Sequence, residues 1–267
     1  MIARALELGS DPPTIYQRWW ASSSSGAWPQ NELQLRVPDM FPDEQWTVID
    51  KAFDGSLSVS NCTDLGSVRS GEWTQIPGQS HAKVKRARSW EASGFLWRQS
   101  RRLEPLLARR WRVRIYIPAG VEHPASVFRG ASEALDREGI WFLGKANLGL
   151  LQRRDQVVIW VSAADAVSAL ETIEEAVRES DLLFGPPPLT LRVGRIGVGH
   201  DPANGRSLGL AICNAISCLA TSSESTWSAD EWDRACGAFA INPVAPWRHP
   251  GDTDPFGAWS ALEARRD

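Results

Sequence analysis

The sequence lacks several features that would assign it to a specialised class of protein. An excess of one charge is missing: 29 Lys and Arg residues stand against 32 Asp and Glu residues, which does not indicate a dedicated nucleic-acid binder. No segment has the roughly 18 uncharged apolar residues that a membrane helix needs. Arg4 and Glu7 interrupt what would be the apolar core of a secretion signal. We therefore expect a cytoplasmic protein with no nucleic-acid or membrane partner.

Cysteine is scarce as well. The four residues Cys62, Cys213, Cys218 and Cys236 show no C-x-x-C spacing and have no histidine nearby, so a zinc site is not expected. Three of them lie in apolar, helix-like stretches, which favours free and mostly buried thiols. The sequence predicts neither a metal ion nor a cofactor.

Tryptophan, in contrast, is abundant, with 14 residues in a chain of 267. Several, such as Trp141 and Trp160, lie in apolar runs and are expected in the core, whereas Trp19 and Trp247 could equally line a groove. A chain of this length can form one large domain or two small ones, and either can bury a sizeable core.

The first 110 residues read as short strands separated by clusters of Gly, Pro, Ser and Asp. Residues 21–31 are expected to form a surface loop. The predicted strands span residues 33–37, 46–49, 56–60, 72–76 and 94–97. This pattern predicts a β-rich N-terminal subdomain over residues 1–110.

From residue 111 the pattern changes, because WRVRIYI at 111–117 alternates apolar and polar residues as a strand with one buried face does. The order β-α-β-β-α-β follows, in which two helices cover one face of an antiparallel sheet. Its further elements are a helix at 123–139, strands at 140–145 and 156–162, a helix at 163–180 and a strand at 189–193. The predicted fold class is therefore α+β, with residues 111–267 forming a second subdomain packed as one unit with the first.

Helices are also predicted at 207–220 and 228–239, the second opened by a capping box of Ser228 and Glu231. Two glycine motifs are rejected as nucleotide sites. Residues 139–145 spell G-x-x-x-x-G-K, but the residues between the glycines favour a strand and no Ser or Thr follows. GRIGVG at 194–199 has its glycines in the wrong order for a dinucleotide fingerprint and is predicted to be a mobile loop.

The charged turn between strands 140–145 and 156–162 is the strongest candidate site. If these strands pair, Lys145 comes within reach of Arg153 or Arg154. Both arginines are not expected to point at Lys145, and Asp155 can pair with whichever is left. Converging cations suit a phosphate, and their charge together with burial lowers a lysine pKa toward that of a base. A solvated loop with a surface salt bridge is the alternative that spacing leaves open.

The order of several short motifs resembles the HopA-type effector family, whose domain also occurs in bacterial clusters that make class V lanthipeptides and thioamitides. The resemblance covers roughly residues 14 to 220. The motifs are YQRWW at 16–20, GFLW at 94–97, RIY at 114–116, F-x-x-K at 142–145, R-x-D at 153–155 and the segment 186–209.

This resemblance implies a carbon–oxygen lyase that acts on a ribosomally made precursor peptide with leader and core parts. A separate phosphotransferase-like kinase, held in a hetero-complex, would phosphorylate Ser or Thr, and the lyase would eliminate phosphate to leave dehydroalanine or dehydrobutyrine. Lys145 matches the family lysine and is the candidate base, Arg153 matches the phosphate-binding arginine, and Asp155 would orient that arginine.

Other residues of the matched motifs are candidates for phosphate contact, proton donation and substrate binding. Arg114 could contact phosphate or only form a structural salt bridge, and Tyr116 could donate a proton. Asp201 and Ser207 belong to the Asp-Pro and Gly-x-Ser pattern and are assigned to substrate binding, with Arg154.

The chain departs from the family pattern after Gly209, where LAIC at 210–213 replaces polar His and Arg residues. His200 is then either a substituted acid or a surface histidine. Two alternatives to a lyase follow: a non-catalytic partner that binds the precursor or its kinase, and a host-directed effector acting on phosphoproteins.

Overall fold

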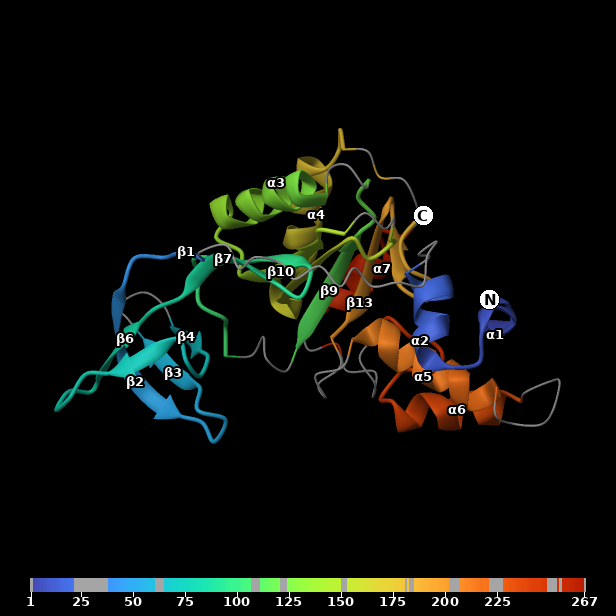
Figure 1. Ribbon diagram of the computed structural model, residues 1–267, viewed down its shortest axis with the longest axis horizontal. Coiled ribbons are helices and arrows are strands. Elements are labelled where there is room, and N and C mark those ends of the chain that lie inside the picture. Colours follow the sequence, from blue (N-terminus) through green and yellow to red (C-terminus); the bar gives the residue numbers. More distant parts are fainter. Residues whose placement is uncertain are drawn as a thin grey trace.

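The computed structural model describes most of the chain. The described residues are 2–21, 38–60, 65–106, 111–120, 124–149, 153–180, 182, 185–201, 207–220, 228–248, 254 and 256–266. They form a mixed α+β fold with two antiparallel sheets, a β-rich N-terminal part and C-terminal helices, which confirms the predicted fold class (Figure 1). The strand predicted at 33–37, residues 22–31 of the predicted loop and Cys62 lie outside the described residues.

An eight-stranded sheet forms the centre of the protein, in the order β1-β7-β8-β10-β11-β9-β13-β12. The predicted order β-α-β-β-α-β is confirmed by β9, α3, β10, β11, α4 and β12. Its strands are β1 (Asp39–Met40), β7 (Ala87–Ala92), β8 (Phe95–Gln99), β9 (Arg112–Ile117), β10 (Phe142–Asn147), β11 (Val157–Ser162), β12 (Leu191–Val193) and β13 (Ile196–His200).

Helices cover both faces of this sheet, so the central strands β9 and β11 are buried on both sides. The prediction of one buried face for residues 111–117 is therefore wrong, because the side that carries Arg114 and Tyr116 is covered as well. In β9, Ile115 packs into one core and Tyr116 into the other. The first core lies under α3 (Pro124–Arg137), α4 (Ala166–Ala176) and α7 (Ala258–Glu263), and η2 (Ala163–Asp165) leads into α4 (Figure 1). The second lies under α1 (Ile2–Leu8), α2 (Pro12–Ile15), η1 (Tyr16–Trp20), α5 (Leu208–Ala220) and α6 (Ala229–Ala238). The predicted capping box at Ser228 and Glu231 is present.

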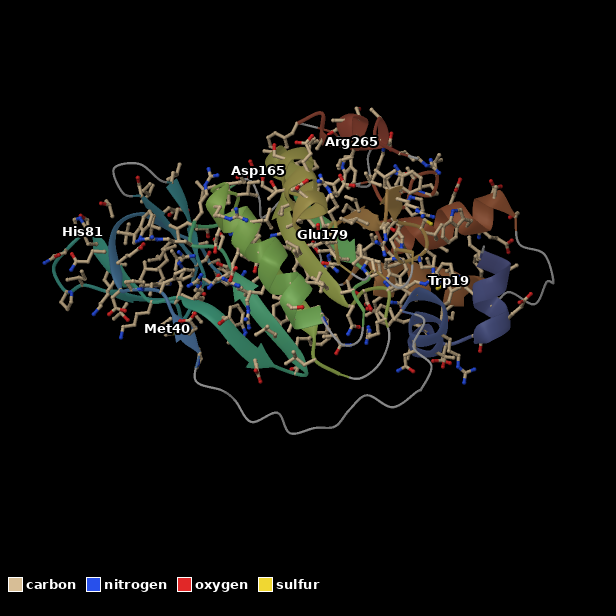
Figure 2. The ribbon with its side chains drawn as sticks, turned by 90° about the horizontal axis from the view of Figure 1, so that it is seen from above. Trp19, Met40, His81, Asp165, Glu179 and Arg265 are labelled. Atoms are coloured by element: carbon tan, nitrogen blue, oxygen red, sulfur yellow. The ribbon has the colours of Figure 1, made fainter. Side chains whose placement is uncertain are left out.

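A second sheet of five strands has its own small core around Trp46 and Val59 and lies at one end of the molecule, with Trp19 toward the other (Figures 1 and 2). Its order is β4-β3-β2-β6-β5. The strands are β2 (Glu44–Lys51), β3 (Leu57–Ser60), β4 (Leu65–Val68), β5 (Trp73–Gln75) and β6 (His81–Val84). Because β8 and β9 both belong to the large sheet, the predicted boundary at residue 110 falls within that sheet. No described helix has the length and apolar character to traverse a bilayer.

Residues 196–199 belong to β13, and residues 194–195 form the turn that joins it to β12, so the prediction of a mobile loop there is wrong. β13 pairs with β9 and places β12, the predicted closing strand, on the outer edge. The glycines that suggested a loop are needed for close packing. A Cβ atom on Gly197 would lie 2.5 Å from Cβ of Pro186, and one on Gly199 would lie 2.4 Å from Cδ2 of Leu208. Glycine inside a strand here marks close approach of a neighbouring segment.

We expect Gly197→Ala to lower the free energy of unfolding by about 1 to 3 kcal/mol, because the ring of Pro186 cannot move aside as a flexible side chain would. Gly130→Ala is the matched control, since nothing lies within 4 Å of a Cβ added there, inside α3. That change should instead stabilise the helix by about 0.5 to 1 kcal/mol. Urea unfolding monitored by tryptophan fluorescence measures both, and equal midpoints would contradict the packing argument.

Candidate functional site

Lys145 lies inside β10, on the sheet face covered by η1 and α5. The predicted pairing of β10 with β11 is confirmed, with Lys145 opposite Val158, but the strand extends to Asn147, so Lys145 is not at its edge. Trp97 of β8 flanks Lys145 on the other side, and Tyr116 of β9 lies opposite Val158. The Cα atoms of Lys145 and Tyr116 are therefore two strand spacings, about 10 Å, apart on one face.

Aromatic rings surround the Lys145 ammonium group, which lies 4.1 Å from the centroid of Phe95 and 5.4 Å from that of Trp97. Burial lowers the pKa of Lys145 to about 8, and the positive charges of Arg114 and Arg153 lower it while Asp155 opposes them. A substantial fraction of this lysine is therefore neutral near physiological pH, as a general base requires.

Arg153 and Asp155 form a buried ion pair beside Lys145. The Arg153 guanidinium donates two hydrogen bonds to the carboxylate, at 2.9 Å from Nε to Oδ1 and 3.1 Å from Nη2 to Oδ2. The Tyr16 hydroxyl donates a third, at 2.6 Å to Oδ2. Burial raises the pKa of Asp155, but Arg153 and Tyr16 outweigh it and hold the pKa below its usual value. The carboxylate is thus charged and fixes the guanidinium in one orientation.

Tyr16 reaches Asp155 because η1 is a single turn of π-helix, closed by a bond of 2.8 Å from the amide of Ala21 to the carbonyl of Tyr16. The amide of Arg154 in turn donates to the carbonyl of Ala21 at 3.1 Å. Burial and the charge of Asp155 raise the pKa of Tyr16 well above its usual value. Such π turns often mark functional sites.

Arg114 on β9, like Arg153, is held by an aspartate. It forms an ion pair with Asp201, and its guanidinium lies over the Trp160 ring at 5.2 Å. Trp160 donates to Asp201 at 3.3 Å and stacks on Trp97, with ring centroids 5.9 Å apart. Trp97 stacks in turn on Trp90 at 6.0 Å. An aromatic row therefore runs from Trp160 on β11, beside the Arg114 pair, past Lys145 to Trp90 on β7.

The Tyr116 hydroxyl is buried and makes no regular hydrogen bond to the described residues. Burial raises the pKa of Tyr116 to about 12, while the adjacent Arg114 opposes this shift. The phenol is therefore protonated at neutral pH and next to a cation that stabilises its anion.

Comparison with known proteins gives a distant likeness in fold. No protein-family model matches the chain, and no curated protein matches it. The similar solved structures include the effector protein from Pseudomonas syringae pv. tomato strain DC3000, at 15% identity over 58% of this chain with a TM-score of 0.45. They also include the effector protein from Pseudomonas syringae pv. syringae strain 61, at 14% identity over 61% with a TM-score of 0.42. The chain spans 62% and 64% of their lengths.

Among the predicted site residues, the structure brings together Lys145, Arg153, Asp155, Arg114 and Tyr116, and Asp201 joins them through Arg114. Asp155 pairs with Arg153, the arginine that the resemblance expects it to orient, since both bonds come from Arg153.

Three predicted residues make their described contacts with groups other than Lys145. His200 pairs with Val113, three positions after the Gly197 that faces Tyr116, so it lies on the opposite face of the sheet and is buried there. The Ser207 hydroxyl accepts the amide of Leu210 at 3.1 Å and caps α5. Arg154 lines a separate cavity at the edge of the sheet.

The apolar segment 210–213 belongs to α5, where Ala211, Ile212 and Cys213 are fully buried in the second core and Leu210 is exposed. Burial, and the nearby charge of Asp155, raise the pKa of Cys213, so this thiol stays protonated. Cys213, Cys218 and Cys236 are all free, as predicted, although Cys218 is exposed. The described residues contain no group of three His, Cys, Asp or Glu placed to hold a metal ion.

Sequence reasoning assigned no role to Tyr16, Phe95 or Trp97, although it noted the motifs YQRWW and GFLW that contain them. Their contacts with Lys145 and Asp155 join segments about 50 to 140 residues apart in sequence, which periodicity cannot reveal.

Proposed function

We propose that the protein is a lyase that eliminates phosphate from phosphoserine or phosphothreonine in a peptide, leaving dehydroalanine or dehydrobutyrine. The observation that carries this proposal is Lys145, a partly buried lysine with a pKa lowered to about 8 beside Arg114 and Arg153. An accessible neutral amine flanked by cations suits the removal of a proton next to a phosphorylated carbon.

In the proposed reaction the Lys145 amine takes the α-proton, and the electron pair of that C–H bond forms the Cα=Cβ double bond. The Cβ–O bond breaks, and phosphate leaves with its electron pair. Tyr116, protonated because of its raised pKa, donates a proton to the leaving oxygen, and Arg114 stabilises the resulting phenolate. The guanidinium groups of Arg114 and Arg153 would hold the phosphate, each arginine being oriented by its aspartate.

The aromatic row gives the route by which a peptide would approach. Phe95, Trp97 and Trp90 are only partly buried, whereas Arg114, Tyr116 and Arg153 are buried. A substrate backbone would therefore lie along β7 and β8, with its phosphorylated side chain directed toward Lys145. The proposed substrate is a ribosomally made precursor, phosphorylated by a separate kinase.

Incubation with phosphoserine and phosphothreonine peptides of varied sequence tests the proposal. We expect each productive peptide to lose about 98 Da, the mass of phosphoric acid, through this elimination. The rate should rise tenfold per pH unit and level off above the Lys145 pKa of about 8, because only the neutral amine accepts a proton. A failure of every peptide to lose this mass would refute the activity.

A second function, that of a non-catalytic partner for the precursor or its kinase, is favoured by one observation. Arg114 and Arg153 are each already paired with an aspartate, which neutralises much of the charge that a phosphate would need. Kinase activity that still requires this protein after Lys145→Ala would support the partner role over catalysis.

A further inference from the structure

A cavity of about 630 Å³ lies at the β12 edge of the large sheet, apart from the Lys145 cluster. Its walls carry four arginines and two tryptophans, together with the segment Pro186–Pro188. None of the lining residues that the structure describes has a carboxylate side chain. The charged and aromatic members are Arg18, Arg154, Arg192, Arg266, Trp19 and Trp247.

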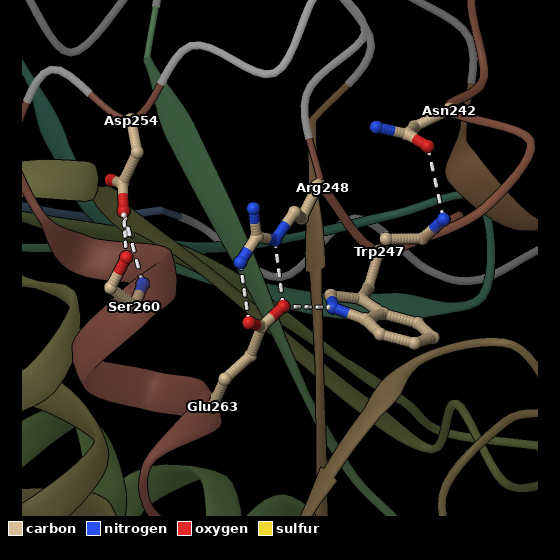
Figure 3. Close-up of polar contacts among 7 residues, drawn as sticks. Asn242, Trp247, Arg248, Asp254, Ser260 and Glu263 are labelled. Atoms are coloured by element: carbon tan, nitrogen blue, oxygen red, sulfur yellow. Dashed lines mark hydrogen bonds and ion pairs between the residues drawn. The ribbon is translucent and has the colours of Figure 1, made fainter.

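The walls of this cavity are held in place by their own contacts. Trp247 donates to Glu263 at 3.0 Å, and Arg248 donates to the same carboxylate at 2.7 Å (Figure 3). The carbonyl of Trp247 accepts the amide of His200 at 2.8 Å, which ties this wall to β13. On the other side, Pro186 packs against Gly197. The cavity is therefore built before any ligand arrives, which lowers the entropic cost of binding.

The positive charge of the four arginines favours an anion as the ligand of this cavity. The Nε atom of Arg154 is buried and has no hydrogen-bond partner among the described residues. Arg266 lies near Glu263, but the hydrogen bonds of that carboxylate are made with Trp247 and Arg248. A buried guanidinium donor is satisfied best by a carboxylate or phosphate oxygen.

We propose that this cavity binds an acidic segment of the substrate peptide through its Asp or Glu side chains, an inference that rests on the proposed function. The volume far exceeds that of a single small anion, and the indole and proline walls suit the apolar part of a peptide. Arg153 and Arg154 are consecutive, yet one contacts Asp155 and the other lines the cavity.

Fluorescence anisotropy of a labelled peptide of alternating glutamate and leucine, added to the full chain, tests this inference. We expect Arg154→Gln and Arg192→Gln each to weaken binding about tenfold, as the loss of a charge-assisted contact does. Arg154→Lys keeps the positive charge but loses the paired N–H donors of the guanidinium group. Its affinity for the peptide should therefore lie between those of Arg154→Gln and the unaltered protein. Arg129→Gln, an equal change of charge on the exposed side of α3, should bind as the unaltered protein does.

Three results would overturn the inference. They are an unchanged affinity in both variants, an equal loss in Arg129→Gln, and equal affinity for a peptide with glutamine in place of glutamate. Displacement of the peptide by inorganic phosphate at equal concentration would show a small-anion site instead.

Melting curves from circular dichroism identify any variant that has failed to fold. Arg192→Gln changes an exposed position, so it is the variant least expected to disturb the fold. Because the assay needs no turnover, peptide binding without phosphate loss would refute the lyase alone, and phosphate loss without peptide binding would refute this inference alone.

Discussion

Lys145→Ala is expected to reduce phosphate elimination by about 10² to 10⁴-fold, the usual contribution of a general base. The loss should fall on kcat, because the proton is taken only in the transition state and Arg114 and Arg153 still bind phosphate in the variant. Single-turnover mass spectrometry with a phosphothreonine peptide measures the rate. A variant that keeps a rate within tenfold of the unaltered protein would exclude Lys145 as the base.

Lys145→Arg separates the role of a base from that of a cation. Arginine retains the positive charge beside Phe95 and Trp97 but does not deprotonate, so it should be as inactive as alanine if Lys145 removes the proton. If Lys145 only attracts phosphate, the arginine variant should retain most of the activity. Lys85→Arg, at an exposed lysine of the small sheet region, is the control for the substitution itself.

Much of the large sheet could be predicted because its strands follow period 2 and its helices follow period 3.6. WRVRIYI at 111–117 shows the first pattern, and the helix predicted at 163–180 shows the second, although the structure ends α4 at Ala176. β13 was missed because its glycines are dictated by packing against Pro186 and Leu208, not by strand propensity. A local pattern carries no information about a neighbour that arrives from elsewhere in the chain.

The candidate site was predictable to the same extent and for the same reason. Lys145 and Arg153 lie on one hairpin, so pairing of two adjacent strands was enough to bring them together. His200 faces away from them because successive residues of β13 point to opposite faces of the sheet. Which residues point to which face depends on the register of the strand pairing, which sequence alone does not fix. Tyr16 comes from the first helices and reaches Asp155 across 139 positions of sequence. Such a contact is set by the tertiary fold alone.

Asp155→Asn is the second change with a large expected effect, and it acts on stability as well as on the pH profile. It leaves the buried Arg153 guanidinium without its charged partner and weakens the bond from Tyr16. Removing one member of a buried ion pair typically costs about 3 to 5 kcal/mol, and urea unfolding measures the loss. Asp43→Asn, which breaks the exposed pair with Lys83, should leave the unfolding midpoint unchanged.

The effect of Asp155→Asn on pH dependence has a definite sign. Asp155 raises the pKa of Lys145 against burial, Arg114 and Arg153, so its loss should move that pKa below about 8. In the fraction that remains folded, the rate of elimination should then level off at a lower pH than in the unaltered protein. Tyr16→Phe removes one hydrogen bond to the carboxylate but keeps its charge, so it should cost about 1.5 to 3 kcal/mol of stability while shifting the profile less. A profile that moves to higher pH in Asp155→Asn would contradict the assignment of Lys145 as the titrating base. Removing the negative charge of Asp155 destabilises the ammonium form, so the pKa of Lys145 can only fall.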